Sequence, residues 1–304
     1  MKDKKEFDVI IVGGSYAGLS AAMALGRSLR SVLIIDSSKP CNRQTPHSHN
    51  FITQDGRTPK EISDKAKAQV LEYPTVKFSN DLVVSVTKDS NIFDIVTQKS
   101  QRLKARKILF ATGVRDVLPN LKGFAQCWGI SVLHCPYCHG YEVAHKNLGI
   151  IANGESAFEL CRLIQNWSDK LTLFTNGESH LTAEQLSLIK KLNIQVVEKE
   201  VGELKHNNGT LKNIVFRNGT KTPIDAIFSS VPFEQHCKIP IDLGCATSEQ
   251  GYLEVDMFQK TNIEGVFCAG DNTTFLRAVP IAIAAGTKAG ASINMELINE
   301  ELPK

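Results

Sequence analysis

The chain has 304 residues, 42% hydrophobic and 22% charged, a balance that excludes a disordered protein and allows two domains of ordinary size. The formal charge of +3 is small and the Lys and Arg residues are scattered, so nothing indicates a nucleic-acid partner. Eight cysteines could indicate secretion, but six stand alone and are expected to be small buried hydrophobes: Cys41, Cys127, Cys161, Cys237, Cys245 and Cys268.

The N-terminus resembles a secretory signal only at first sight. Lys2, Lys4 and Lys5 precede an apolar run, but Asp8 and glycines interrupt that run and no cleavage site follows it. No apolar stretch reaches the roughly 18 residues that a membrane span needs. We therefore expect a cytoplasmic protein without membrane contact, whose bulk thiols stay reduced.

The beginning of the chain predicts a βαβ unit. A buried strand, a helix and a second strand are expected in turn at Phe7–Val12, Leu19–Leu29 and Val32–Asp36. The glycine turn Gly13-Gly14-Ser15-Tyr16-Ala17-Gly18 lies between the first strand and the helix, whose N-terminus would present free N–H groups to a pyrophosphate. Asp36 lies near the position of a ribose-binding acid. Although Ser15 replaces the middle glycine, the combination predicts dinucleotide binding.

A loop-like segment, 39–60, carries Asn42, Arg43, His47 and His49, which either line a cofactor or form ordinary surface. A helix is expected next, followed by three strands with hairpin-like alternation, at Lys60–Leu71, Val76–Phe78, Leu82–Val86 and Phe93–Val96. A buried strand then ends on Ala111-Thr112-Gly113. These small residues would let the backbone pass close to a cofactor, or they form a plain turn.

The segment His134-Cys135-Pro136-Tyr137-Cys138-His139-Gly140 holds two cysteines two residues apart. Thiols at this spacing can close a disulfide or bind a metal ion. Zinc is the weaker hypothesis, because the adjacent His and Cys side chains cannot all point inward and no second Cys-x-x-Cys completes a site. No metal site is therefore expected.

A second βαβ unit follows at Leu148–Ala152, Phe158–Trp167 and Leu171–Phe174, with the turn 153–157 after its first strand. This unit is degraded, because Ala152 replaces the first turn glycine. Thr175-Asn176-Gly177 at the end of its second strand offers no arginine for a 2′-phosphate, although Glu178 is near. Weak nucleotide binding and lost nucleotide binding both remain open.

Near its end the chain predicts a strand that stops at Gly270-Asp271, and then a helix over Ile281–Ile298. An acid at such a strand end can accept a hydrogen bond from a ribityl hydroxyl. The N-terminus of the following helix could be aimed at a flavin ring.

In this order, the glycine turn, Ala111–Gly113, Cys135-x-x-Cys138 and Gly270-Asp271 resemble the low-molecular-weight thioredoxin reductase family over nearly the whole chain. The resemblance implies an α/β fold with two Rossmann-like nucleotide-binding domains. The FAD-binding domain would comprise residues 1–115 and 238–304. The inserted NAD(P)-binding-like domain, 116–237, would carry the redox pair. The family also implies a homodimer formed through the FAD domain.

The resemblance assigns FAD contacts to matching positions, and the polar loop adds three more candidates. The full set is Gly13, Gly14, Ser15, Tyr16, Ala17, Gly18, Asp36, Asn42, Arg43, His49, Val83, Ala111, Thr112, Gly113, Gly270, Asp271, Arg277, Ala278 and Val279.

Three departures from the family are visible: His139 replaces its acid, Ala278 replaces its Gln, and the NADPH arginines are absent. Such departures are similar to those of a branch of flavin-dependent dithiol oxidases. The hypothesis is FAD-coupled thiol–disulfide exchange with catalytic Cys135, Cys138 and His139. Cys138 would face the flavin, and Cys135 would face a dithiol or disulfide substrate, either a small molecule or a thioredoxin-like protein.

His139 would transfer the proton near neutral pH. The use of NADPH, NADH or neither stays open, with NADPH expected to be a poor donor. An NAD(P)H-dependent thioredoxin or disulfide reductase is the alternative within the same class. A redox-sensing flavoprotein without catalysis is the alternative from another class.

Overall fold

The structure is a computed structural model that describes residues 5–303, so Lys2 and Lys4 lie outside the described residues. The chain separates into two compact units. Unit 1 contains the chain up to Arg43, Pro59–Arg115 and the chain from Phe233 onward, and unit 2 contains Gln44–Thr58 and Asp116–Pro232. Residues 44–58, expected in the FAD-binding domain, belong to unit 2. Residues 233–237, expected in the inserted domain, belong to unit 1. Within residues 5–303, no helix has both the length and the hydropathy required to span a membrane.

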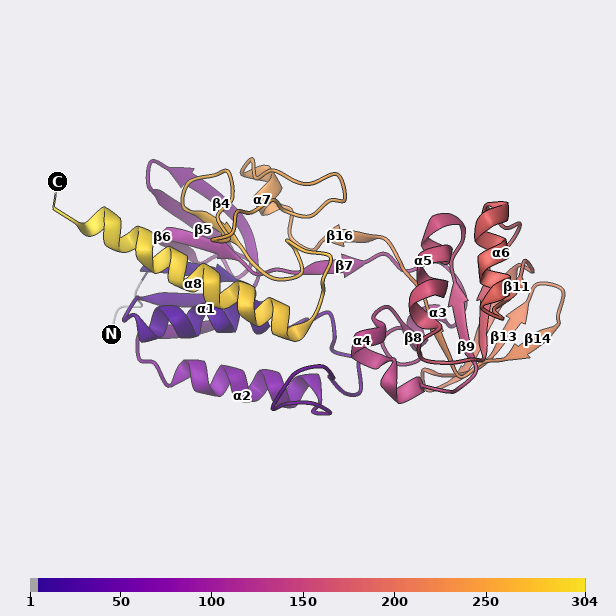
Figure 1. The fold of residues 1–304 in the computed structure, drawn as a ribbon. Helices are drawn as coiled ribbons and strands as arrows, with labels where there is room; N and C mark the ends of the chain where they lie inside the picture. The colour runs from indigo at the N-terminus through magenta and orange to yellow at the C-terminus, as the bar shows by residue number, and fades with distance from the viewer. Residues whose placement is uncertain (1–4, 304) are drawn as a thin grey trace. The chain divides into compact units, whose positions relative to one another are not determined.

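Unit 1 is built on a mixed sheet with the strand order β3-β2-β1-β6-β5-β4, in which β17 also pairs with β6 (Figure 1). The parallel strands are β1 (Glu6–Val12), β2 (Val32–Asp36), β3 (Val76–Asn80), β6 (Arg102–Phe110) and β17 (Val266–Cys268). Only β4 (Val83–Asp89) and β5 (Ile92–Thr97) form the expected antiparallel hairpin. The prediction of a hairpin for 76–78 is wrong, because β3 pairs in parallel with β2.

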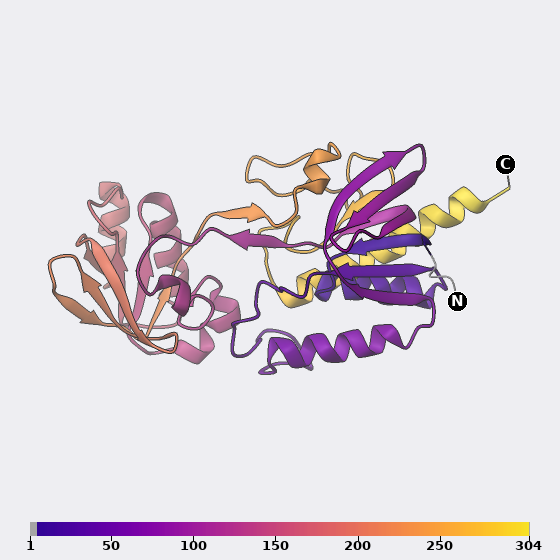
Figure 2. The same ribbon diagram turned by 180° about the vertical axis from the view of Figure 1, so that it is seen from behind.

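The helices of unit 1 are α1 (Tyr16–Arg27), α2 (Pro59–Leu71), the short α7 (Ile239–Asp242) and α8 (Val279–Glu301). Helices α1 and α8 run side by side in both views (Figures 1 and 2). Gly286 makes this approach possible, because a Cβ there would lie 2.1 Å from Ala17 O. Ser20 Oγ also donates to Ile283 O at 2.9 Å. The two helices therefore pack with their backbones almost in contact.

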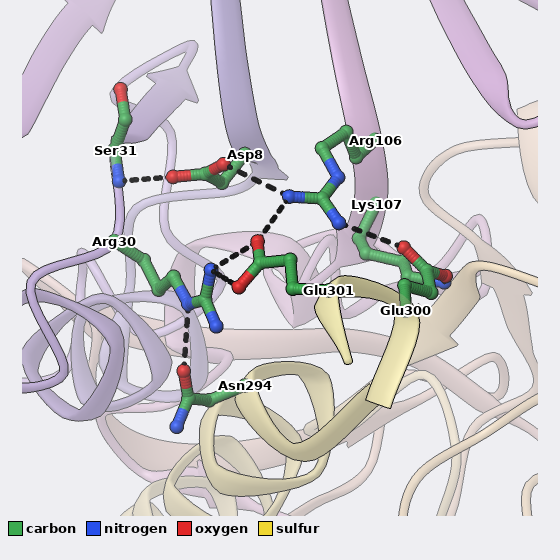
Figure 3. A network of polar contacts seen from close by, with 8 residues as sticks. All are labelled: Asp8, Arg30, Ser31, Arg106, Lys107, Asn294, Glu300 and Glu301. Atoms are coloured by element: carbon green, nitrogen blue, oxygen red, sulfur yellow. Dashed lines mark hydrogen bonds and ion pairs between the residues drawn. The ribbon is translucent and has the colours of Figure 1, made fainter. Parts of the chain in front are cut away.

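A network of charges connects the C-terminal end of α8 to the sheet and to Arg30 in the turn after α1 (Figure 3). Arg106 on β6 contacts the carboxylates of Glu300 and Glu301, and Arg30 also contacts Glu301. Lys107, only 4% exposed, is paired with Glu300 and Glu296. Burial lowers the pKa of Lys107, but the two carboxylates outweigh that effect and raise it, so this buried lysine stays charged.

Unit 2 contains a five-stranded parallel sheet in the order β11-β10-β9-β15-β8. Its strands are β8 (Val132–Leu133), β9 (Leu148–Ile151), β10 (Leu171–Phe174), β11 (Gln195–Val197) and β15 (Ala226–Phe228). Its helices are α3 (Phe124–Cys127), α4 (Pro136–His139), η1 (Tyr141–Val143), α5 (Gly154–Ile164) and α6 (Ala183–Lys191). A fully buried core, with Ile150, Leu173 and Phe228 among its members, lies against α5 and α6.

A second sheet in unit 2 is antiparallel and was not predicted: β12 (Val201–Asn207), β13 (Thr210–Phe216) and β14 (Lys221–Pro223). Two further short strands, β7 (Val114–Asp116) and β16 (Phe233–Gln235), pair with each other. The two units fit two Rossmann-like α/β domains, which confirms the predicted fold class. The prediction of six buried isolated cysteines is wrong for Cys41, which is exposed, and for Cys237, which is intermediate.

Candidate active site

The glycine turn of unit 1 adopts a conformation that only glycine accommodates. Gly13 has φ +105°, and a Cβ there would lie 2.3 Å from Ala111 O. Gly18 is as restricted, because its Cβ would lie 1.9 Å from Gly13 O. Ser15 is the N-cap of α1, and among the described residues its side chain makes no capping bond. The N-terminus of α1 therefore lacks a bond from its N-cap side chain, and helix N-termini in general can bind phosphate oxygens.

Asp36 lies at the end of β2 and holds this turn in place. Its Oδ1 accepts a 2.9 Å hydrogen bond from Gly14 N–H, and its Oδ2 accepts one of 2.9 Å from Ser38 N–H. Phe78 packs beside Gly14, where an added Cβ would lie 2.7 Å from the ring. The carboxylate therefore connects the phosphate turn to the position where a ribose is expected.

Thr112 and Gly113, which follow β6, show whether a polar cofactor fits unit 1. Thr112 Oγ1 is buried, and among residues 5–303 no group lies within hydrogen-bond distance of it. An unpaired buried hydroxyl costs about 1–3 kcal/mol, so a ligand atom that bonds it would stabilise the site. Gly113 has φ +61° and open space beside it. A cofactor with polar atoms, such as FAD, fits this arrangement.

The N-terminus of α8 and the end of β17 complete the predicted set in unit 1. Gly270 has φ +100°, and an added Cβ would lie 3.1 Å from Ala17 Cβ. Asp271 Oδ2 lies 4.0 Å from Arg277 Nε, at the limit of an ion pair, and both side chains are largely buried. Ala278 is the N-cap of α8. These residues flank the first turns of two helices.

The other predicted contacts in unit 1 are less direct. The Val83 side chain is 5% exposed and lies in the hydrophobic core, so only its backbone could meet a cofactor. Asn42 Nδ2 donates to Tyr16 OH at 3.4 Å, which ties the loop to α1. Arg43 Nη1 donates to Pro40 O in its own turn.

In unit 2, the redox pair lies on the turn that follows β8, at the carboxyl edge of the parallel sheet. Cys135 is the N-cap of α4, and the backbone N–H groups of Cys138 and His139 point back to its carbonyl at 3.3 and 3.2 Å. Gly140 lets this turn approach Trp167, because a Cβ would lie 2.5 Å from the indole Nε1. Tyr137, 64% exposed, meets Trp167 edge-on at 5.8 Å.

Cys135 differs electrostatically from a buried isolated cysteine such as Cys161. A hydrogen bond from Cys138 lowers the pKa of Cys135 to about 7, despite the opposing effect of burial, and the backbone N–H groups of Cys138 and Tyr137 assist. By contrast, burial raises the pKa of Cys161 to about 12. Cys135 is therefore a thiol that ionises near neutral pH, as thiol–disulfide exchange requires.

His139 has two neighbours that sequence reasoning did not connect with it. Its ring centroid lies 6.5 Å from that of His49 at 90°, and His49 Nε2 lies 3.5 Å from Glu142 Oε1. Burial lowers the pKa of His139, Glu142 opposes this, and His49 adds to it. His49, expected among the cofactor contacts, thus lies beside the redox segment. Glu142 was missed, although its spacing of three residues from His139 was a visible signal.

The turn of the second βαβ unit is closed by one side chain. Asn153 is the N-cap of α5, and its Oδ1 accepts 2.8 Å hydrogen bonds from the N–H groups of Gly154 and His180. Its Nδ2 donates to Glu178 O at 2.8 Å and to Thr175 O at 3.3 Å. The side chain makes four hydrogen bonds at the place where a nucleotide phosphate would lie. An Asn before a helix was a sequence signal for this cap.

The segment 175–177, which the sequence showed to lack arginines for a 2′-phosphate, is also hydrogen-bonded within the chain. Asn176 Oδ1 accepts from Val201 N–H at 2.7 Å, and Thr175 Oγ1 donates to Gly177 O at 2.7 Å. Within residues 5–303, no group of three or more His, Cys, Asp and Glu side chains is arranged to hold a metal ion.

The pyridine nucleotide-disulphide oxidoreductase family matches residues 7–286. Thioredoxin reductase tcpT of Claviceps purpurea is 30% identical over 302 residues, covering 96% of this chain and 94% of that protein. The thioredoxin reductase of Listeria monocytogenes is 28% identical, covering 99% and 96%. An oxidoreductase structure from Agrobacterium tumefaciens is 32% identical with a TM-score of 0.92, covering 97% of this chain and 100% of that chain.

Proposed function

We propose that this chain, which belongs to the pyridine nucleotide-disulphide oxidoreductase family and is thioredoxin reductase-like, works as an FAD-dependent dithiol oxidase. It would exchange electrons among the flavin, the Cys135–Cys138 pair and a dithiol or disulfide substrate, with weak or no use of NADPH. FAD, the cofactor of this family, supplies a two-electron acceptor when it is bound.

The observation that carries this proposal is the pairing of a thiol of pKa about 7 with a neighbouring thiol and a histidine. One substrate thiol loses its proton to His139 and its sulfur bonds to Cys135 as the Cys135–Cys138 bond breaks. The second substrate thiol then displaces Cys135, which leaves readily because its pKa is low. The substrate loses two electrons, and the cysteine pair gains them.

FAD would be held by unit 1. The open N-terminus of α1 suits its pyrophosphate, Asp36 suits the ribose, and the unpaired Thr112 hydroxyl suits a polar group of the cofactor. The remaining predicted contacts stay part of the proposal: Tyr16, Ala17, Asn42, Arg43, Val83, Ala111, Gly113, Gly270, Asp271, Arg277, Ala278 and Val279. The roles of the two cysteines, with Cys138 toward the flavin, follow from the resemblance.

Weak use of NADPH is supported by the bonding of the second turn. Asn153 already occupies the helix N–H group that a phosphate would bind. Glu155 in the first turn of α5 and the exposed Glu178 would both repel a phosphate. A pyridine nucleotide would have to displace the four hydrogen bonds of Asn153 before it could bind.

The second candidate is an NAD(P)H-dependent thioredoxin or disulfide reductase. It is favoured by the names of the relatives and by the retention of the β9–α5–β10 unit. A redox sensor without turnover is the third. Under each of the three we propose a cytoplasmic homodimer, in line with the isolated thiols and the family resemblance, with neither nucleic acid nor membrane as a partner.

Anaerobic reduction of the purified yellow protein tests the proposal. Dithiothreitol should bleach the flavin rapidly, NADPH and NADH should bleach it slowly, and readmitted oxygen should restore the colour. Fast, saturable bleaching by micromolar NADPH would instead identify the reductase. Bleaching by dithiol without repeated turnover under air would identify the sensor.

A further inference from the structure

A loop of unit 2 holds a second histidine rigidly beside the redox segment. Residues 44–58 belong to this unit, and the loop is closed by its own backbone. Ser48 N–H donates to Arg57 O at 2.7 Å, and Gly56 N–H donates to Ser48 O at 2.9 Å. The His49 side chain that follows is only 20% exposed. Its position is therefore fixed by main-chain hydrogen bonds.

His49 lies between two carboxylates and next to His139. Its Nε2 lies 3.5 Å from Glu142 Oε1, and its Nδ1 lies 3.5 Å from Asp55 Oδ2. Its ring centroid lies 6.5 Å from that of His139 and 6.4 Å from that of His47. The Asp55 side chain is 65% exposed, against 38% for Glu142 and 20% for His49. The cluster therefore leads from a half-buried imidazole beside the thiols to an exposed carboxylate.

We propose that His49, held by Glu142, is a positioning residue that receives protons from His139 and passes them to solvent during thiol exchange. This inference rests on the proposed function, because it concerns the same exchange between a dithiol and the cysteine pair. It adds a second imidazole and two carboxylates to a site that the sequence assigned to His139 alone.

The exchange leaves a proton on His139 whenever a cysteine sulfur stays ionised. Oxidation of one dithiol breaks two S–H bonds and forms one S–S bond in the substrate, while the Cys135–Cys138 bond takes up the two electrons and opens into two thiolates. Two protons on these sulfurs would balance the reaction, but Cys135, with a pKa of about 7, is partly a thiolate at pH 7. The proton that it does not take can pass from His139 to His49, whose ring lies between the carboxylates of Glu142 and Asp55.

The environment of His139 favours this transfer. Burial lowers the pKa of His139, and the neighbouring His49 lowers it further, whereas Glu142 raises it. An imidazole with a lowered pKa is neutral at pH 7 and releases a captured proton readily. The positive charge would thereby move from the imidazole of His139 to that of His49, which lies beside the exposed carboxylate of Asp55.

The test uses the FAD-loaded enzyme with His49→Gln, and with His47→Gln as the matched control. His47 lies on the same loop, but its Nδ1 contacts Gly56 O at 2.9 Å, and among residues 5–303 it has no carboxylate partner. We expect anaerobic bleaching by dithiothreitol to be on the order of tenfold slower in His49→Gln, less than the hundredfold or more of a direct acid–base group. His47→Gln should match wild type, and FAD content should be unchanged in both.

Added imidazole separates proton transfer from structural damage. Because a mobile base can carry the proton, it should restore the rate of His49→Gln, and likewise that of Glu142→Gln, whose side chain is 38% exposed. A wild-type rate in both variants, or a slow rate that imidazole leaves unchanged, would overturn the inference. A wild-type enzyme that dithiothreitol cannot bleach would overturn the proposed function itself, and the inference with it.

Discussion

The two βαβ units of this chain share a topology but use the polar groups at their first turn in opposite ways. In unit 1 the N-terminus of α1 has no side-chain cap among the described residues, and the turn is braced from outside by Asp36. In unit 2 the corresponding turn is filled by the Asn153 side chain, which bonds Gly154 and His180. The first turn lacks a bond from its N-cap side chain, and the second is capped by Asn153.

If unit 2 binds NADPH weakly, as we propose, this difference explains how a nucleotide fold could lose its ligand without losing its shape. The parallel sheet and α5 of unit 2 remain, because they depend on buried apolar residues such as Ile150 and Leu173. Phosphate binding depends instead on a few backbone N–H groups, and one amide side chain is enough to occupy them. The same edge of the sheet carries Cys135 and Cys138, to which we assign the catalytic role.

The largest effect should come from adding a methyl group to each turn. Gly13→Ala would place its Cβ 2.3 Å from Ala111 O at a φ of +105°, so the turn must move and FAD should be lost. Gly154→Ala, at φ +59° with its nearest neighbour 3.9 Å away, should cost about 1–2 kcal/mol, the strain of a Cβ on a left-handed backbone, and leave FAD bound. The 450 nm absorbance per protein chain measures both, and a fully yellow Gly13→Ala enzyme would contradict the assignment of the two turns.

The next effect concerns the redox segment that unit 2 retains. His139→Ala should slow disulfide exchange by roughly two to four powers of ten, the scale of a positioned acid–base group, with FAD content unchanged. Because the pKa of His139 is lowered, chiefly by burial, wild-type activity should persist below the ordinary histidine value and fall only as the pH drops further. Stopped-flow rates across pH measure this, and a rate within a few-fold of wild type would assign His139 to packing.

Sequence patterns revealed the first βαβ unit because its signals are strong and local. Val32–Asp36 was predicted with the bounds of β2, since a continuous apolar run ends there on an acid. Three alternating residues at Val76–Phe78 could not reveal the parallel partner of β3. Helix α5 begins at Gly154, four residues before the expected start, because turn residues and first-turn residues overlap in type.

The candidate site was predictable only where its residues share a motif. Cys135, Cys138 and His139 follow one another, so their proximity needs no tertiary information. The meeting of His49 with Glu142 depends on the loop 44–58 folding with unit 2, and that loop has no periodicity from which its partner can be deduced. The strands β12–β14 were missed because charged residues interrupt their short apolar alternation.

A smaller effect should separate the two thiols of unit 2. Because a hydrogen bond from Cys138 is the main cause of the lowered pKa of Cys135, Cys138→Ala should raise that pKa from about 7 toward the ordinary value of 9.0. At pH 7 the thiolate fraction would then fall by up to about 50-fold. Cys138→Ser keeps a donor and is the matched control. The pH dependence of iodoacetamide alkylation at the Cys135 peptide, followed by mass spectrometry, measures this pKa in each variant. If Cys138→Ala gave the same pH profile as Cys138→Ser and wild type, the hydrogen bond from Cys138 would not be the cause of the lowered pKa.

The smallest effect should come from partly reopening the second turn. Glu178 is exposed, and its backbone carbonyl accepts a hydrogen bond from Asn153 Nδ2. Glu178→Arg would replace a repulsive carboxylate with a guanidinium suited to a 2′-phosphate, and one charge-assisted hydrogen bond of about 1.5 kcal/mol corresponds to a roughly tenfold gain in affinity. We therefore expect the half-saturating NADPH concentration for anaerobic flavin reduction to fall about tenfold, with NADH unchanged because it lacks that phosphate.

Asn153→Gly should add to this gain, because it frees the N–H group of Gly154, while the lost cap costs about 1 kcal/mol of folding free energy. Glu72→Arg, at an exposed position of unit 1, makes the same charge change outside unit 2 and is the control. An equal gain in Glu72→Arg would mean that net charge alone attracts NADPH. No gain in Glu178→Arg, even combined with Asn153→Gly, would mean that unit 2 excludes the nucleotide by something other than its closed turn.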